Sequence, residues 1–187
     1  MENLRYSHNK LYILDQTLLP NEEKWVEIKS KEQAYKAIQT LMVRGAPAIG
    51  IFAAYSMAVF SADNDIYELK EYLDSSRPTA VNLSWATSRM VTAYEQGKSL
   101  VDEAIEIQNE DIEMCRKISE YGLSLLKDGD GIITHCNAGE LAASRYGTGL
   151  GPLILGKEKG YSFHVFSDET RPLLQGARLT SYELERA

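Results

Sequence analysis

Four short segments of this sequence contain residue types that can bind an anion or move a proton. In the first, Arg44-Gly-Ala-Pro-Ala-Ile-Gly50, Pro47 is typical of the first turn of a helix. The free N–H groups of that turn and the helix dipole favour an anion, and Arg44 adds a bidentate cation. Because Gly45 and Ala46 allow close backbone approach, the segment is a candidate phosphate cradle. A helix–turn–helix corner with a solvated arginine is an equally good interpretation.

The second segment, Cys136-Asn-Ala-Gly139, follows an apolar, β-branched run that predicts a strand over 132–136. Ligands of open α/β sheets bind beyond the carboxyl ends of the strands, so the thiol of Cys136 is expected at that edge. A free cysteine is more often a small buried hydrophobe, but this position favours function. His135 is not expected to activate the thiol, because adjacent strand residues point to opposite faces.

The third segment is the loop Asp168-Glu-Thr-Arg-Pro-Leu-Leu-Gln-Gly176, which follows a second predicted strand at 163–168. Its position after a strand places it beside Cys136. Its polar side chains, Gln175 among them, can grip a sugar or a phosphate. A surface connector in which Arg171 pairs with a neighbouring carboxylate is the alternative.

The fourth segment is Ser76-Arg-Pro-Thr79, in which Pro78 favours an extended backbone at Arg77. Taken alone, Arg77 is best interpreted as a solvated arginine.

Metal and nucleotide motifs are not found in this sequence. Its three histidines and two cysteines show no close ligand spacing, so we predict no metal site. Neither GxGxxG nor GxxxxGK[ST] occurs, and Gly147-Thr-Gly-Leu-Gly151 has the wrong spacing for either.

The elements that must position these residues differ between the two parts of the chain. Strands are expected at 10–14 and 24–28, before a helix that Ser30 caps, that buries 34, 37, 38 and 41, and that Gly45 ends. A buried core helix should run from Pro47 to about residue 62, and two more helices should follow. Ser99 should cap a long helix that buries 101, 104, 105, 108, 112, 115, 122 and 125 and exposes its acidic run, 103–113.

Near residue 128 the pattern changes to strand, crossover, strand and helix, which opens a parallel α/β sheet. We therefore predict an α/β protein with two domains. Residues 1–127 form a mostly helical N-terminal domain with a small β element. Residues 128–187 form the first half of a Rossmann-like domain, because two parallel strands cannot close a core by themselves.

Composition limits the possible functions of the 187 residues. Hydrophobic residues make up 44% and charged residues 25%, as in globular proteins. The net charge of −7 disfavours nucleic acids and anionic membranes, so a bound phosphate needs a local positive cluster. Two cysteines suggest a reducing compartment, and no signal peptide or span of ~20 apolar residues is evident. A cytoplasmic protein is expected.

Taken together, these segments resemble the methylthioribose-1-phosphate isomerase family, which includes 5-deoxyribose-1-phosphate isomerases, ribose-1,5-bisphosphate isomerases and regulatory subunits of initiation factor 2B. The resemblance covers nearly the whole chain in order. Its motifs are Val43-Arg-Gly-Ala-Pro-Ala-Ile-Gly50, Ser76-Arg-Pro-Thr-Ala-Val-Asn-Leu83, Thr134-His-Cys-Asn-Ala-Gly139, Tyr146-Gly-Thr148, Asp168-Glu-Thr-Arg-Pro172 and Gln175-Gly-Ala-Arg-Leu-Thr180.

The resemblance implies the same two-domain fold, usually a homodimer, and neither an organic cofactor nor a required metal. It implies conversion of an aldose 1-phosphate into the ketose 1-phosphate, with Cys136 as a catalytic residue. It places substrate contacts at Arg44, Gly45, Ala46, Arg77 and Gln175.

The sequence departs from the family pattern after the segment that contains Gln175. The family's catalytic aspartate and a substrate-binding Asn-Lys pair lie further downstream, whereas this chain ends at Ala187, so we expect it to have little or no activity alone. Glu140 and the segments 142–146 and 156–160 fit the 5-deoxyribose-phosphate relatives somewhat better. The two sugars differ only in the substituent on C5. A binding pocket distinguishes substituents of that size by about 1–3 kcal/mol, so activity on both sugars is expected.

A non-catalytic regulatory or ligand-binding module of the initiation factor 2B type is the alternative function. The presence of both Arg44-Gly-Ala46 and Cys136 favours the enzyme, because a scaffold needs neither.

Overall fold

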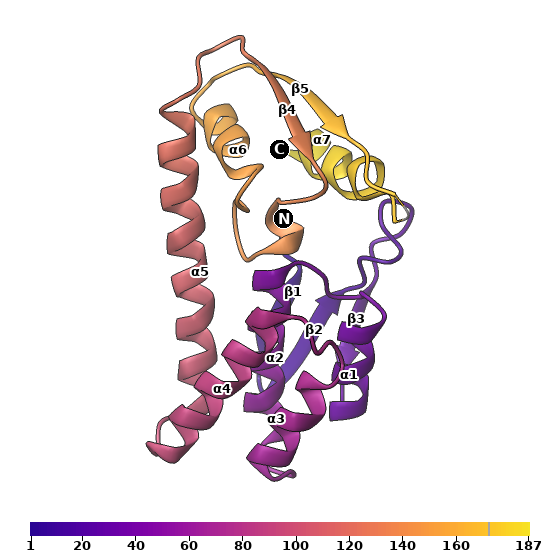
Figure 1. Ribbon diagram of the computed structural model, residues 1–187, viewed down its shortest axis with the longest axis vertical. Helices are drawn as coiled ribbons and strands as arrows, with labels where there is room; N and C mark the ends of the chain where they lie inside the picture. Colours follow the sequence, from indigo (N-terminus) through magenta and orange to yellow (C-terminus); the bar gives the residue numbers. More distant parts are fainter. Residues whose placement is uncertain (172) are drawn as a thin grey trace.

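The computed structural model describes residues 1–171 and 173–187; Pro172, which belongs to one quoted motif, lies outside the described residues. Figure 1 shows helical elements around a small sheet at one end and a second sheet at the other, with the long helix α5 (Leu100–Leu123) spanning both. This arrangement confirms the predicted α/β class, with a helical N-terminal region followed by a parallel sheet.

The first sheet contains three antiparallel strands in the order β1 (Leu4–Ser7), β2 (Lys10–Leu14) and β3 (Trp25–Ile28). His8 and Asn9 join β1 to β2 with φ angles of 51° and 59°. Positive φ at both positions is what a tight hairpin turn needs to match the strand twist.

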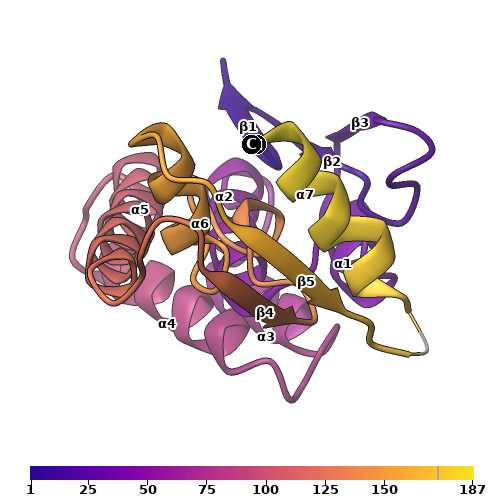
Figure 2. The ribbon, with the colours of Figure 1, turned by 90° about the horizontal axis from the view of Figure 1, so that it is seen from above.

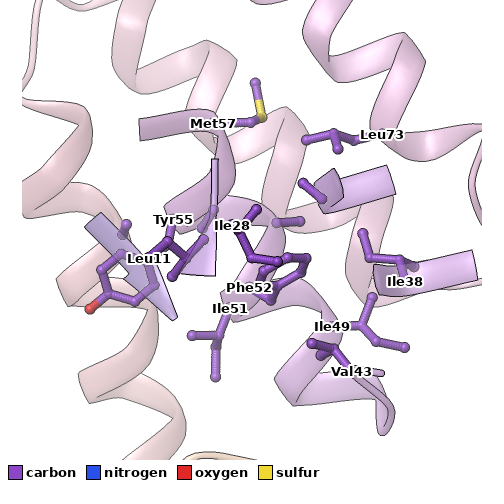
Figure 3. Close-up of a cluster of buried hydrophobic side chains, with 14 of the residues drawn as sticks. Leu11, Ile28, Ile38, Val43, Ile49, Ile51, Phe52, Tyr55, Met57 and Leu73 are labelled. Atoms are coloured by element: carbon purple, nitrogen blue, oxygen red, sulfur yellow. The ribbon is translucent and has the colours of Figure 1, made fainter. Parts of the chain in front are cut away.

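Four helices follow this sheet: α1 (Lys31–Gln39), α2 (Ala46–Phe60), α3 (Ile66–Asp74) and α4 (Val81–Glu95). Helices α1 and α2 pack on its strands, and α3 and α4 pack on α2. Helix α2 is apolar on all sides and packs against α4 and α5, so the prediction of a buried core helix is confirmed. Figure 3 shows its Phe52 among Leu11, Ile28 and Ile38.

The end of α1 differs from the prediction. The helix ends at Gln39, and Leu41 has a φ of 63°, so the predicted apolar stripe does not continue to this residue. Gly45 does not end α1; it has a φ of 90° and precedes the first residue of α2.

The buried face of α5 was also predicted incorrectly. Glu103 and Asp111, expected on the solvent face, are buried, whereas Leu125 is 82% exposed and Ile105 is 38% exposed. Each buried carboxylate has a partner outside α5, since Glu103 binds Arg89 and Asp111 accepts from the N–H of Ser144. Periodicity of apolar residues alone does not reveal such partners.

The second sheet consists of the parallel strands β4 (Gly131–His135) and β5 (His164–Asp168), with His135 opposite Asp168. Between them the chain forms a short helix, η1 (Glu140–Ala142), and α6 (Gly151–Glu158), which packs on α5. After β5 come a π-helical turn, η2 (Gly176–Thr180), and α7 (Ser181–Arg186), which lies along β5 in Figure 2.

One face of this second sheet is open. Ile133 is 73% exposed and Phe166 is 61% exposed, as expected for two parallel strands without further members. Among the described residues, no helix is long and apolar enough to cross a lipid bilayer.

Candidate functional site

The start of α2 lies at the junction of the two regions. Its first turn contains Pro47 and receives no side-chain capping bond from the described residues, so N–H groups remain available for a ligand. Gly45 packs against η1, where a Cβ atom would overlap the backbone of Ala142. The positive φ and this close approach both require glycine, which brings η1 next to the start of α2.

Arg44 reaches from this junction to the residue after Cys136. Its Nη1 donates to Oδ1 of Asn137 at 2.6 Å, and its Nη2 lies 3.4 Å from the Asn137 carbonyl oxygen. Burial lowers the pKa of Arg44 and the charges of Arg178 and Arg77 add to this, whereas Cys136 and Glu183 act in the opposite direction. These charges are therefore close enough to interact with the guanidinium.

Cys136 lies directly after β4 rather than inside it. Its φ of 63° takes it out of the ladder, so the predicted strand end at Cys136 is one residue too late. Its carbonyl oxygen accepts from the hydroxyl of Thr180, which holds this uncommon conformation. The residue is half-buried, unlike Cys115, which is 1% exposed and whose pKa is raised to about 11, first by burial and then by the charge of Asp111.

Asn137 connects three segments of the chain. Its Nδ2 donates to Oε1 of Glu183 at 2.9 Å and to Oγ1 of Thr180 at 3.3 Å, while its Oδ1 accepts from Arg44. Sequence reasoning missed Glu183. The only signal for it is that Thr180 and Glu183 are three residues apart, which places both on one helical face.

The loop after β5 is held mainly by its own polar groups. The carboxylate of Glu169 accepts from the N–H groups of Gly176 and Ala177 at 3.0 and 2.9 Å. Desolvation by the neighbouring loop acts to raise the pKa of the exposed Glu169, but its hydrogen bonds from the backbone, including that of Thr170, outweigh it and the pKa is lowered. Gln175 is half-buried and accepts from the hydroxyl of Thr170. Within the described residues, its hydrogen bond is to this loop and not to Arg44.

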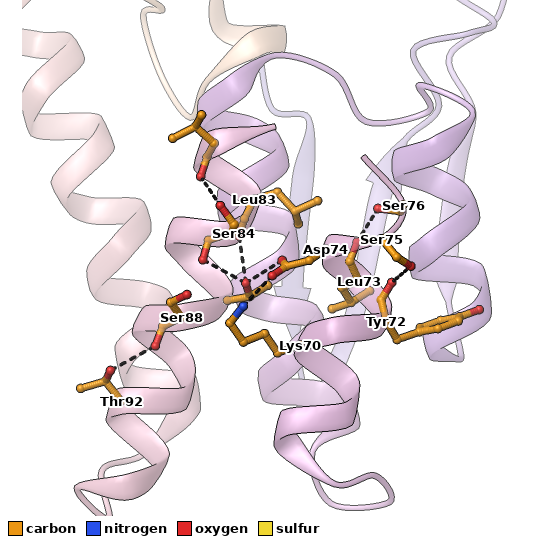
Figure 4. Close-up of polar contacts among 12 residues, drawn as sticks. Lys70, Tyr72, Leu73, Asp74, Ser75, Ser76, Leu83, Ser84, Ser88 and Thr92 are labelled. Carbon is orange, nitrogen blue, oxygen red and sulfur yellow. Dashed lines mark hydrogen bonds and ion pairs between the residues drawn. The ribbon is translucent and has the colours of Figure 1, made fainter. Parts of the chain in front are cut away.

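Arg77 lies in the short connection between α3 and α4. Its N–H donates to the carbonyl of Asp74, and its own carbonyl accepts from Ala80 at 2.9 Å. Ser76 donates to the carbonyl of Leu73, and Asp74 pairs with Lys70 (Figure 4). The turn is therefore well anchored, and the charge of the half-buried Arg77 lowers the pKa of Arg44.

The structure thus bonds Arg44 to Asn137, the residue that follows Cys136, and the charges of Arg178 and Arg77 act on the guanidinium of Arg44. It links Gln175 only to its own loop. Arg44 lies beside an open helix N-terminus, and the charges of Arg178 and Arg77 both lower its pKa, so positive charge gathers here although the chain carries a net charge of −7. Such an arrangement can bind a phosphate next to a thiol. Within residues 1–171 and 173–187, no three His, Cys, Asp or Glu side chains are grouped to hold a metal ion.

Two named isomerases are similar to this chain in sequence. A 5-deoxyribose 1-phosphate isomerase of Petrotoga mobilis is 52% identical over 96% of the chain, which spans 57% of that protein. A methylthioribose-1-phosphate isomerase of Parabacteroides distasonis is 51% identical over 94% of the chain and 58% of its own length. The chain therefore spans somewhat more than half the length of these relatives.

Solved structures share its fold. The structure of subunit delta of the translation initiation factor eIF-2B from A. fulgidus superposes with a TM-score of 0.87 and 39% identity. The match covers all of this chain and 59% of that subunit. The structure of a 5-methylthioribose 1-phosphate isomerase from Pyrococcus horikoshii superposes with a TM-score of 0.86 and 34% identity. The match covers 98% of this chain and 57% of that protein. The model of the initiation factor 2 subunit family matches residues 42–187, and the chain belongs to this family.

Proposed function

We propose that this chain is the sugar-phosphate-binding part of an isomerase that converts an aldose 1-phosphate into the ketose 1-phosphate. The names of the relatives that are 50–52% identical support 5-deoxyribose 1-phosphate or methylthioribose 1-phosphate as the substrate. The observation that carries the proposal is that Asn137 holds the guanidinium of Arg44 beside Cys136, at the open start of α2.

In this proposal the phosphate lies at the first turn of α2. The backbone N–H groups of Gly45 and Ala46 donate to its oxygens, and Arg44 and Arg77 supply positive charge. Gln175 would contact the sugar, although its side chain is bonded to Thr170 in this structure. A sugar there would replace the hydroxyl of Thr170 as its partner.

The thiol of Cys136 is the proposed catalytic group. A phosphate on the anomeric oxygen prevents spontaneous ring opening, so an acid must protonate the ring oxygen before a hydrogen moves from C2 to C1. A half-buried thiol at the end of β4 is accessible to such a sugar, and limited water access would protect the open-chain intermediate.

A second function is supported by the fold neighbour named as an initiation-factor subunit, with a TM-score of 0.87. In that case the chain would be a regulatory module that binds a phosphorylated ligand or a nucleotide without converting it. This function would be favoured if the full-length protein bound a pentose 1-phosphate and its isomerase activity did not depend on Cys136.

The homodimer and the cytoplasmic location also remain part of the proposal, as does a domain boundary near residue 128. Exposed apolar side chains on α5 and just after its end are consistent with a partner surface: Met114, Ile118, Tyr121 and Leu125. Light scattering after size-exclusion chromatography would give the mass of the particle.

The test of the proposed function is calorimetric titration with a pentose 1-phosphate. Arg44→Ala should weaken binding by about 1.5–3 kcal/mol, the usual contribution of a hydrogen bond to a charged group. Cys136→Ser should bind as the wild type does, because the thiol acts on the sugar and not on the phosphate. Arg116→Ala is the matched control, since this arginine pairs with Glu113 and Glu120 on the surface of α5. Equal affinities of the wild type and Arg44→Ala would contradict the phosphate assignment.

A further inference from the structure

We infer that Glu183 is a positioning residue of the site, which sets the orientation of Arg44 through the side-chain amide of Asn137. The inference rests on the proposed function and extends it to a residue in α7. It concerns a buried carboxylate for which the proposed chemistry has no other use.

Glu183 is held in one place by its surroundings. Its side chain is 4% exposed, and Oε1 accepts from Nδ2 of Asn137 at 2.9 Å and from the N–H of Leu141 at 3.3 Å. Within the described residues, Oε2 has no hydrogen-bond partner and lies against Gly139, where a Cβ atom would overlap it. A side chain at position 139 would therefore displace the carboxylate.

The amide of Asn137 has a donor end and an acceptor end, and the site uses both. The donor end faces two acceptors, Glu183 and the hydroxyl of Thr180, so the acceptor end must face Arg44. The reverse orientation would place the NH2 group against a guanidinium, donor to donor. An acceptor at position 183 thus selects the orientation that binds Arg44.

This arrangement orients Arg44 without neutralising it. Asn137 lies between the carboxylate and the guanidinium, so Arg44 donates there to a neutral amide instead of forming an ion pair. Its remaining donors stay available for a phosphate. To orient the amide of Asn137, Glu183 needs only an acceptor at Oε1. A raised pKa, caused mainly by burial and opposed by the bond from Asn137, does not remove that acceptor, because a protonated carboxyl still accepts.

A purely structural role for Glu183 would be to hold η1 through Leu141. Binding and spectroscopy distinguish the two roles. Glu183→Met keeps the size of the side chain but removes the acceptor, whereas Glu183→Gln keeps a carbonyl oxygen there. Glu185→Met is the matched control, because Glu185 lies on the same helix and is exposed.

The experiment measures dissociation constants for inorganic phosphate and for a pentose 1-phosphate. Glu183→Met should weaken both about tenfold, Glu183→Gln should stay within about threefold of the wild type, and Glu185→Met should not differ. In the Arg44→Ala background, Glu183→Met should have no further effect on binding, since Asn137 then has no guanidinium to orient. Equal binding by Glu183→Met and the wild type, or an undiminished effect without Arg44, would overturn the inference.

A second measurement does not depend on binding. The side-chain N–H signal of Arg44 in the NMR spectrum should be sharp in the wild type and broadened in Glu183→Met, or in Glu183→Asp if the former does not fold. If neither the wild type nor Arg44→Ala bound phosphate, the proposed function would fail, and this spectrum would still decide the role of Glu183. An unchanged Arg44 signal in these variants would count against it.

Discussion

The region around α2 and the region around β4 and β5 are stabilised in different ways. Phe52 in α2 is fully buried in a cluster that draws on β1–β3 and α1–α5, whereas Phe166 in β5 is 61% exposed. Apolar packing therefore stabilises the first region. The second region has a much smaller buried cluster, which includes Leu14 and Leu19 from the N-terminal part of the chain.

Directional hydrogen bonds join the two regions. The side-chain amide of Asn3 donates to the carbonyls of Glu140, Leu141 and Ala143 in and next to η1. Arg178 donates to the carbonyls of Gln16, Thr17 and Leu19. Such bonds specify relative position more narrowly than apolar contact does. The comparison indicates that the candidate site lies at a junction held by polar contacts, beside the smaller of the two buried apolar clusters.

The largest expected effect contrasts two phenylalanines. Phe52→Ala should lower the free energy of unfolding by about 3–5 kcal/mol, because it leaves a cavity in a closed core. Phe166→Ala should change it by less than about 0.5 kcal/mol, because its ring is largely in solvent. Urea denaturation followed by circular dichroism measures both. Similar losses in the two variants would mean that the exposed face of β5 is covered in solution.

The next effect concerns the contact between the regions. Gly45→Ala should cost more than about 2 kcal/mol, since it adds a clash with Ala142 to the left-handed backbone penalty. Gly97→Ala is the control, because Gly97 also has a positive φ but no atom lies within 4 Å of its added Cβ. Thermal unfolding compares the two. A smaller loss at Gly45 than at Gly97 would show that η1 does not press on the start of α2.

A pH effect is expected at the polar junction. Burial raises the pKa of Glu183 above its ordinary value of 4.5, so above that pH the folded protein binds more protons than the unfolded chain. Its stabilising contribution is present below the unfolded pKa and is lost as pH rises through the folded pKa. Glu183→Gln should therefore flatten the fall in unfolding free energy above pH 4.5, by at most about 1.4 kcal/mol per pH unit.

Asp111 provides the comparison for this pH effect. Burial raises its pKa too, against the bond from Ser144, so the same sign applies and part of the slope should persist in Glu183→Gln. Denaturant titrations between pH 4.5 and 8 measure the slopes. An identical slope in the wild type and Glu183→Gln would show that Glu183 is equally protonated in both states.

The sequence predicted the elements that depend on neighbouring residues. The hydroxyl of Ser30 accepts from the N–H of Gln33, and the buried helix that follows Gly45 has proline in its first turn, both as predicted. The same is true of the parallel pairing that places Asp168 opposite His135, next to Cys136. In each case local chemistry or chain topology is sufficient.

The contacts that assemble the site depend on residues far apart. Asn137 is 93 residues from Arg44 and 46 from Glu183, and no local pattern encodes either bond. The left-handed backbone of Cys136 is stabilised by Thr180, 44 residues away. The acidic residues of α5 were misplaced for the same reason, because their partners, Arg89 and Ser144, lie on other elements.

The smallest expected effect is confined to the helical region. Ser30→Ala should lower the free energy of unfolding by about 1 kcal/mol, the usual value for a lost helix cap, because the N–H of Gln33 loses its acceptor. Ser84→Ala is the control, since that exposed hydroxyl only donates back to Val81 within α4. Neither variant should change the affinity for phosphate, because the cap lies at the exposed start of α1 and not among the polar contacts of the junction. A weaker phosphate affinity in Ser30→Ala would mean that the two regions are coupled through α1, contrary to the separation argued above.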